Sequence, residues 1–113
     1  MNPIDVVQRQ LETYNRRELD GFCDLFADDA QIFDLGATVP TFVGKEAIRA
    51  RYRDLFERSP ALHSSVLNRT ALGRVVVDLE HITGRNGSPG VFAVIAIYEV
   101  DAGKIQRVHF ARP

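Results

Sequence analysis

Three side chains in this sequence combine an ionisable group with a position where a proton could be exchanged: Asp34, Tyr14 and His81. Asp34 ends an alternating segment in which it shares one strand face with Ile32. His81 follows Glu80 in a β-branched segment whose inward face the alternation leaves open, and histidine can act as acid or base near neutral pH. Tyr14 lies in a helical apolar stripe, where tyrosine more often packs in a core.

The other residues with chemical potential favour structural roles. His63, His81 and His109 have no two members at the close spacing of metal ligands. The glycine-rich stretch 84–90 lies between two strand patterns and opens no helix, so it is unlike a phosphate loop. Cys23 has no activating neighbour in sequence and is expected to pack as a small apolar residue. We expect neither a metal nor another cofactor.

Composition bounds the class of protein. The 113 residues are 45% apolar and 26% charged, which predicts a single globular domain over residues 1–113. Fourteen basic residues balance 15 acidic ones, so no nucleic-acid partner is expected. The arginines of 49–53 alternate with acidic residues and are expected to cover a solvated helix face. One cysteine, no leader pattern and an apolar run of only 91–98 predict a cytoplasmic chain without membrane contact.

The first half of the chain has mainly helical periodicity. Asn2 and Pro3 suit the start of a helix whose apolar stripe reaches Tyr14. A second, shorter helix is predicted over 19–26, and a third from Gly44 to about Ser59. The segment 30–35 between them alternates as a strand.

The second half is rich in β-branched residues. Strands are predicted over 63–70, 75–83, 91–100 and 104–112, with short turns that suit antiparallel hairpins. Helices followed by strands indicate an α+β domain.

Four phrases of the sequence, together with the order of elements, carry a family likeness: 6–9, 18–22, 25–30 and 42–48, the last leading into Tyr52. On these the chain resembles the NTF2-like superfamily, and within it the SnoaL-like and ketosteroid-isomerase-like proteins. The resemblance covers nearly the whole chain. It implies a cone in which three N-terminal helices pack into a curved mixed or antiparallel β-sheet and enclose an apolar pocket.

The resemblance also assigns site residues. It places Asp34 at the general-base position of steroid isomerases, where poor solvation by an apolar cavity would raise the pKa of the carboxyl. The two oxyanion-hole positions of those enzymes fall on Gln10 and Ala96, which supply neither a tyrosine nor a protonated aspartate. Tyr14 lies one helical turn beyond Gln10.

The same alignment, extended by strand alternation, predicts the pocket wall. Its ligand-binding candidates are Gln10, Phe22, Phe26, Phe92, Val94, Ala96, Tyr98, Val108 and Phe110. The opposite face of the strand at 91–100 is also apolar, and members of the family that the chain resembles commonly pair sheet against sheet. A homodimer through the outer sheet face is therefore expected.

Three functions remain open from the sequence. The first is ketosteroid-isomerase-like proton transfer, an allylic isomerisation of an apolar substrate with Asp34 as base. The second is a carrier or sensor that holds an apolar ligand without catalysis, which the residues at the oxyanion positions would suit. The third is epoxide hydrolysis, which needs a second carboxylate such as Asp78 or Glu80 on an inward strand face.

Overall fold

The computed structural model describes all 113 residues as three helices, six strands and one short 3₁₀ turn. In chain order these are α1 (Pro3–Arg16), α2 (Leu19–Cys23), β1 (Phe26–Asp34), β2 (Phe42–Val43), α3 (Lys45–Arg58), β3 (His63–Leu72), β4 (Val75–Thr83), η1 (Arg85–Gly87), β5 (Phe92–Asp101) and β6 (Lys104–Ala111). The predicted α+β class, with three helices and a mixed sheet, is confirmed.

The first helix begins and ends at clear sequence signals. The Asn2 side chain accepts a hydrogen bond from the Asp5 amide at 2.9 Å, and Pro3 occupies the first turn, where no donor is needed. The helix ends at Arg16, and the next residue, Arg17, has a left-handed backbone conformation. Its buried face carries both apolar and polar residues, including Val6, Gln10 and Tyr14, and this mixture matters for the site.

All six strands belong to one sheet in the order β2-β1-β6-β5-β4-β3. The four long strands β3 to β6 form antiparallel hairpins with their neighbours, as predicted. β1 pairs parallel to β6, so the first and last strands of the chain are neighbours in the sheet. Parallel pairing requires a long connection, and here the helix α3 and the hairpins provide it.

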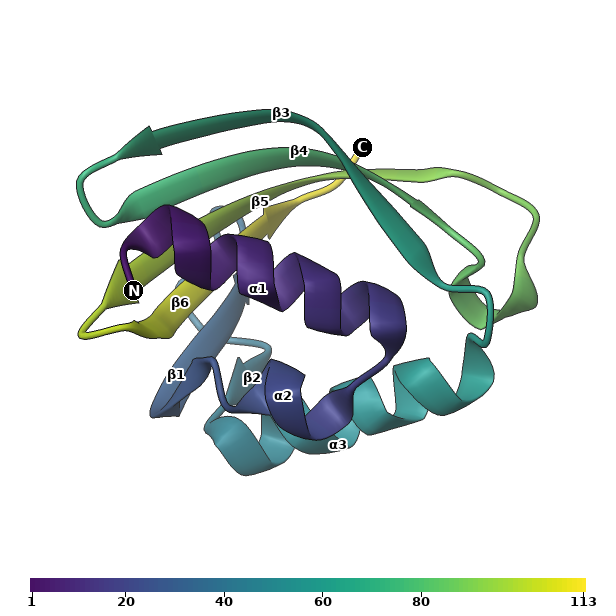
Figure 1. Cartoon of the computed structure of the whole chain (residues 1–113), viewed down its shortest axis with the longest axis horizontal. Coiled ribbons are helices and arrows are strands. Elements are labelled where there is room, and N and C mark those ends of the chain that lie inside the picture. Colours follow the sequence, from purple (N-terminus) through teal and green to yellow (C-terminus); the bar gives the residue numbers. More distant parts are fainter.

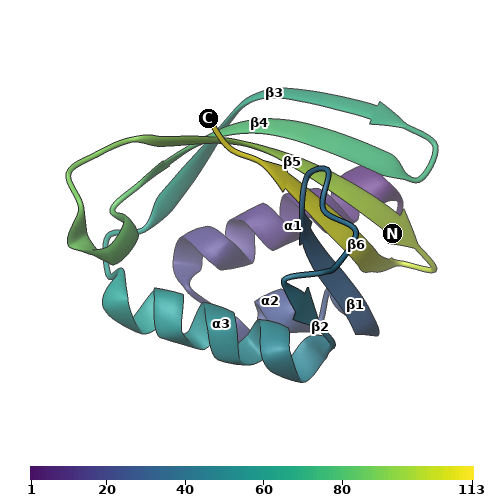
Figure 2. The same cartoon turned by 180° about the vertical axis from the view of Figure 1, so that it is seen from behind.

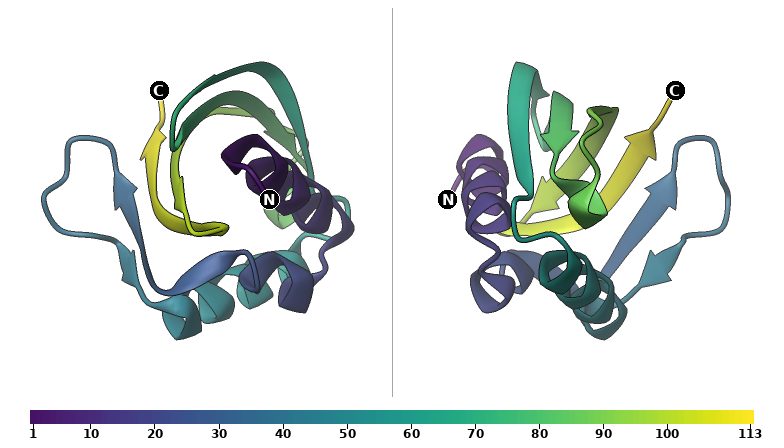
Figure 3. Two further views of the ribbon diagram at one scale, coloured as in Figure 1. Left: turned by 60° about the vertical axis from the view of Figure 1, so that its left-hand side comes forward. Right: turned by 90° about the vertical axis from the view of Figure 1, so that its right-hand side faces the viewer.

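The sheet curves around the helices. Figure 1 shows β3, β4 and β5 arching over α1, with α2 and α3 on the far side of that helix. The reverse view in Figure 2 shows β1 and β2 closing one side next to α3. Seen more nearly end-on, the strands wrap around α1 (Figure 3). The concave face of the sheet is therefore the one that meets the helices.

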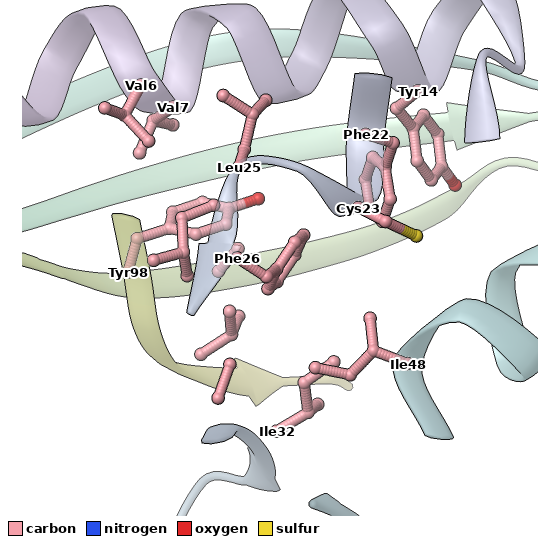
Figure 4. Close-up of a cluster of buried hydrophobic side chains, with 14 of the residues drawn as sticks. Val6, Val7, Tyr14, Phe22, Cys23, Leu25, Phe26, Ile32, Ile48 and Tyr98 are labelled. Carbon is pink, nitrogen blue, oxygen red and sulfur yellow. The ribbon is translucent and has the colours of Figure 1, made fainter. Parts of the chain in front are cut away.

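The core lies where helices and concave sheet meet. Five rings, those of Tyr14, Phe22, Phe26, Tyr52 and Phe56, pack on one another with centroid separations from 4.5 to 6.4 Å. Figure 4 shows several of these side chains together with the valines of α1.

The structure corrects the boundary between α2 and β1. The second helix ends at Cys23 rather than Phe26, and Phe26 begins the first strand. Leu25 accepts a hydrogen bond from the Ile105 amide at 2.8 Å, so pairing with the distant strand β6 extends β1 toward the helix. The short strand β2 was not predicted. No helix of the chain is long and apolar enough to cross a membrane.

Candidate functional site

A cavity of about 400 Å³ lies between the concave face of the sheet and the helices α1 and α3. Of its 21 lining residues 13 are hydrophobic, a balance typical of sites for small organic molecules. The wall draws on β1, β4, β5 and β6, and the residues just beyond β4 and β6 also reach it.

Glu80 is the buried carboxyl group of this cavity. It points inward from β4 and is only 7% exposed. Ser64 Oγ donates a hydrogen bond to Glu80 Oε1 at 2.7 Å, and the Tyr98 hydroxyl lies 3.3 Å from Glu80 Oε2. The same hydroxyl lies 3.3 Å from Gln10 Oε1. These contacts connect α1, β3, β4 and β5 into one polar cluster on an otherwise apolar wall.

The environment favours the neutral form of this group. Burial raises the pKa of Glu80, and the negative charge of Asp78 adds to the rise, while the hydrogen bond from Ser64 opposes it. Burial and the nearby Glu80 also raise the pKa of Tyr98 well above its ordinary value. When Glu80 is protonated it can donate to the Tyr98 oxygen, which leaves the Tyr98 hydrogen for Gln10.

Two further tyrosines offer hydroxyl groups to the cavity. Tyr14 and Tyr52 both line it, neither hydroxyl has a hydrogen-bond partner within the chain, and neither oxygen is sealed in the interior. Burial raises the pKa of Tyr52 to about 12 and raises the pKa of Tyr14 as well. Both hydroxyls therefore stay protonated and can donate to a bound molecule.

Asp34 also lines the cavity, but at its open end. Its side chain is 63% exposed, and Arg112 Nη1 donates a hydrogen bond to Asp34 Oδ1 at 2.5 Å. The expectation of a poorly solvated Asp34 is wrong, because β1 ends at this residue and the chain reaches solvent there. The partner arginine follows β6, the strand that pairs with β1.

His81 does not reach the cavity. Its neighbours Glu80 and Ile82 line the wall, and alternation along β4 turns the His81 side chain to the outer face of the sheet. The sequence did not show which face of β4 lines the cavity, and the structure shows that it is the face of Glu80 and Ile82. His81 is on the other face and pairs with Ala93 of β5.

Five of the nine predicted lining residues do line the cavity: Gln10, Phe92, Val94, Tyr98 and Phe110. The other four, Phe22, Phe26, Ala96 and Val108, point inward but are almost completely buried in the core. Alternation identifies the side of the sheet and not the depth along it, which explains the correction for Ala96 and Val108. Phe22 lies on α2 and packs with Phe26 in the cluster of aromatic rings.

The second inward carboxylate is already engaged. Asp78 is fully buried and accepts two hydrogen bonds from Arg69, Nε to Oδ1 at 2.7 Å and Nη2 to Oδ2 at 2.9 Å. The same guanidinium donates to Gln8 Oε1 at 2.8 Å. This fork-shaped pair holds β3, β4 and α1 together and does not line the cavity.

The sequence analysis did not identify Arg51 as a site residue. It lies in the basic segment assigned to a solvated helix face, yet its side chain lines the cavity and is half-buried. Arg85, in the turn η1, lines the cavity too. Arg51 was not predicted because α3 is weakly amphipathic. Arg85 was not predicted because it lies in a turn between two strands.

Comparison with known proteins places the chain among relatives of the same fold. The SnoaL-like domain family matches residues 7–108. No curated protein matches the chain. An uncharacterised cystatin-fold protein from Novosphingobium aromaticivorans is 27% identical, with a TM-score of 0.89 and 99% of each chain covered.

Two more distant solved structures share the fold. One is an LEH-like epoxide hydrolase from M. tuberculosis, 18% identical with a TM-score of 0.78, covering 98% of this chain and 82% of that one. The other is a protein of ketosteroid-isomerase-like fold from Catenulispora acidiphila in complex with trimethylamine, 17% identical with a TM-score of 0.76, covering 97% and 85%. The predicted NTF2-like architecture is thus confirmed.

Proposed function

This chain belongs to the SnoaL-like domain family, and on that premise we propose that it is an enzyme which moves a proton on a small, largely apolar organic molecule. Glu80 is the proposed acid–base residue. One observation carries the proposal: a buried carboxyl group with a raised pKa lies on the wall of a largely apolar cavity. A carboxyl group tuned in this way is a stronger base when ionised than an exposed one.

The proposed reaction is an isomerisation next to a carbonyl group. Ionised Glu80 accepts the proton from a carbon beside the carbonyl, and the electron pair of that C–H bond moves to the carbonyl oxygen as an enolate. The hydroxyls of Tyr14 and Tyr52 are the donors available to this oxygen, replacing the two oxyanion positions that Gln10 and Ala96 occupy. Return of the proton to a different carbon completes an allylic shift with no net change in atoms.

Asp34 is a second candidate base on the wall of the same cavity. Its side chain is exposed and paired with Arg112, so it lacks the buried, apolar surroundings that Glu80 has. Epoxide hydrolysis is supported less well, because Asp78 is held by Arg69 and leaves Glu80 without a second free carboxylate on the wall.

The test is a turnover screen with β,γ-unsaturated carbonyl compounds, including Δ5-3-ketosteroids, monitored by the ultraviolet absorbance of the conjugated product. We expect Glu80→Gln to lower kcat by about 100-fold or more, because Gln keeps the shape but cannot take the proton. Glu57→Gln, an exposed glutamate on α3, is the matched control and should keep full activity.

The outcomes separate the candidates. If Asp34→Asn lost turnover and Glu80→Gln kept it, the acid–base residue would be Asp34 rather than Glu80. Ligand binding without turnover in any of the proteins would favour a carrier or sensor.

We also propose that the protein forms a homodimer through the outer face of the sheet. Apolar residues lie side by side there across β4 and β5, since Leu79 is opposite Ile95 and Val77 is opposite Ile97. Leu79 and Ile95 are more than one-third exposed, and the row continues to His109, whose ring stacks on Phe33 at 4.7 Å. A face of this kind on a small chain suits a second copy.

A further inference from the structure

The mouth of the cavity is strongly basic. Three arginines line it, Arg51 from α3, Arg85 from η1 and Arg112 just after β6. Asp34 is the acidic residue at the mouth, and it is paired with Arg112. The chain as a whole has a net charge of −1, so this concentration of positive charge is a local feature of the cavity.

Two of these guanidinium groups have no acidic partner. None of the nine ion pairs of the chain includes Arg51 or Arg85, and both side chains are half-buried. Like charges that are gathered in a partly dehydrated place repel one another, and a bound anion would relieve that cost.

Two of the three arginines lie over aromatic rings. The guanidinium carbon of Arg85 lies 5.7 Å from the ring centre of Phe92, and that of Arg112 lies 5.2 Å from the ring centre of Phe110. The turn that carries Arg85 is fastened to the end of α3, since the Asn86 amide donates to Ser59 Oγ at 2.8 Å. Arg51 is on that same helix, so α3 and the turn attached to its end carry both unpaired arginines.

Arg85 and Glu80 lie at different depths along the sheet. Phe92, beneath Arg85, pairs with Ile82, and Val94 pairs with Glu80, two residues farther along the strand. Two residues of strand correspond to about 7 Å. A negative group would be attracted by the arginines at the mouth and repelled by ionised Glu80 on the inner wall.

We propose that the ligand of this cavity is an amphipathic organic anion, an apolar molecule whose carboxylate is bound by Arg51 and Arg85. The planar fork of an arginine matches a carboxylate, and the apolar body then lies against Phe92 and Phe110. In this orientation the reacting carbon is several bonds away from the carboxylate, near Glu80. The substrate class rests on the proposed function, whereas the binding of the anion can be tested without turnover.

The experiment is isothermal titration of matched acid and amide pairs of equal size, such as 4-phenylbutanoate with 4-phenylbutanamide and octanoate with octanamide. We expect at least one acid to bind about tenfold or more tightly than its amide, because charge-assisted hydrogen bonds are stronger than neutral ones. The acid should bind more weakly as salt is added, while the amide should be nearly insensitive.

The variants locate the preference. Arg51→Gln with Arg85→Gln should reduce the acid-to-amide ratio to about threefold or less and leave amide affinity unchanged, which would exclude misfolding as the cause. Arg53→Gln, an exposed arginine on the same helix, is the matched control and should keep the ratio.

Equal affinity for acid and amide in the wild-type protein, binding of neither member of any pair, or a ratio that survives the double substitution would overturn the proposal. Glu80→Gln distinguishes it from the proposed function. That variant should lose turnover and still prefer the acid, so an unchanged turnover would count against the acid–base assignment alone.

Discussion

Two glycines in one turn provide a matched test of how the mouth of the cavity is held. Gly84 precedes η1 and Gly87 is its last residue, and both have positive φ, +72° and +74°. A Cβ added at Gly84 would lie 2.5 Å from the carbonyl carbon of Ala61 and 3.0 Å from the Leu62 nitrogen, both backbone atoms. A Cβ at Gly87 would meet open space. The comparison therefore separates conformational strain from steric overlap.

The expected magnitudes follow from these two terms. Alanine with a left-handed backbone costs about 1 kcal/mol at either position. At Gly84 the overlap forces a backbone shift that adds about 2 kcal/mol. The free energy of unfolding should thus fall by about 3 kcal/mol in Gly84→Ala and by about 1 kcal/mol in Gly87→Ala, close to 12 °C and 4 °C in Tm. The reduced freedom of the unfolded chain is the same for both and cancels.

Urea unfolding monitored by circular dichroism measures both free energies, and the acid-and-amide titration measures the functional consequence. Gly84→Ala should displace the turn and weaken the preference for the carboxylate, whereas Gly87→Ala should keep it. Equal stabilities of the two variants, within about 0.5 kcal/mol, would refute the close backbone approach. An unstable Gly84→Ala that keeps the full preference would show that the turn does not position Arg85.

Three other predictions concern the interior and the outer face. The raised pKa of Glu80 means that the folded chain holds this proton more tightly than the unfolded chain, so stability is lost as pH rises from about 4.5 through the folded-state pKa. Glu80→Gln should remove that loss, which urea unfolding at a series of pH values will detect; a parallel pH dependence in both proteins would contradict it. Asp78→Asn leaves the Arg69 guanidinium without its buried partner and should cost about 3 kcal/mol, and the double variant Asp78→Leu with Arg69→Met should recover most of this on denaturant unfolding. Ile97→Glu on the outer face should convert the proposed dimer to a monomer by light scattering and leave ligand affinity intact, and a monomeric wild-type protein would reject the dimer.

Much of the fold could be predicted because it depends on local patterns. Asn2 and Pro3 at the start of α1 act within a few residues, and the alternation over 75–83 and 91–100 reports strands directly. The short turns between the last four strands dictate antiparallel hairpins. The resemblance carried by the segments around Phe22 and Gly44 added the curvature of the sheet and the presence of a cavity.

The tertiary structure alone decided which residues meet in that cavity. Both faces of β4 mix apolar and ionisable side chains, so the sequence could not show whether Glu80 or His81 faces the cavity. The register with β5 and the helices on the concave side decide that it is Glu80. The exposure of Asp34 depends on where β1 ends and on an arginine 78 residues away. Alternation and helical period encode the direction of a side chain from its own element. Depth, charge pairing and the opening of a cavity depend on contacts between elements that are distant in the chain.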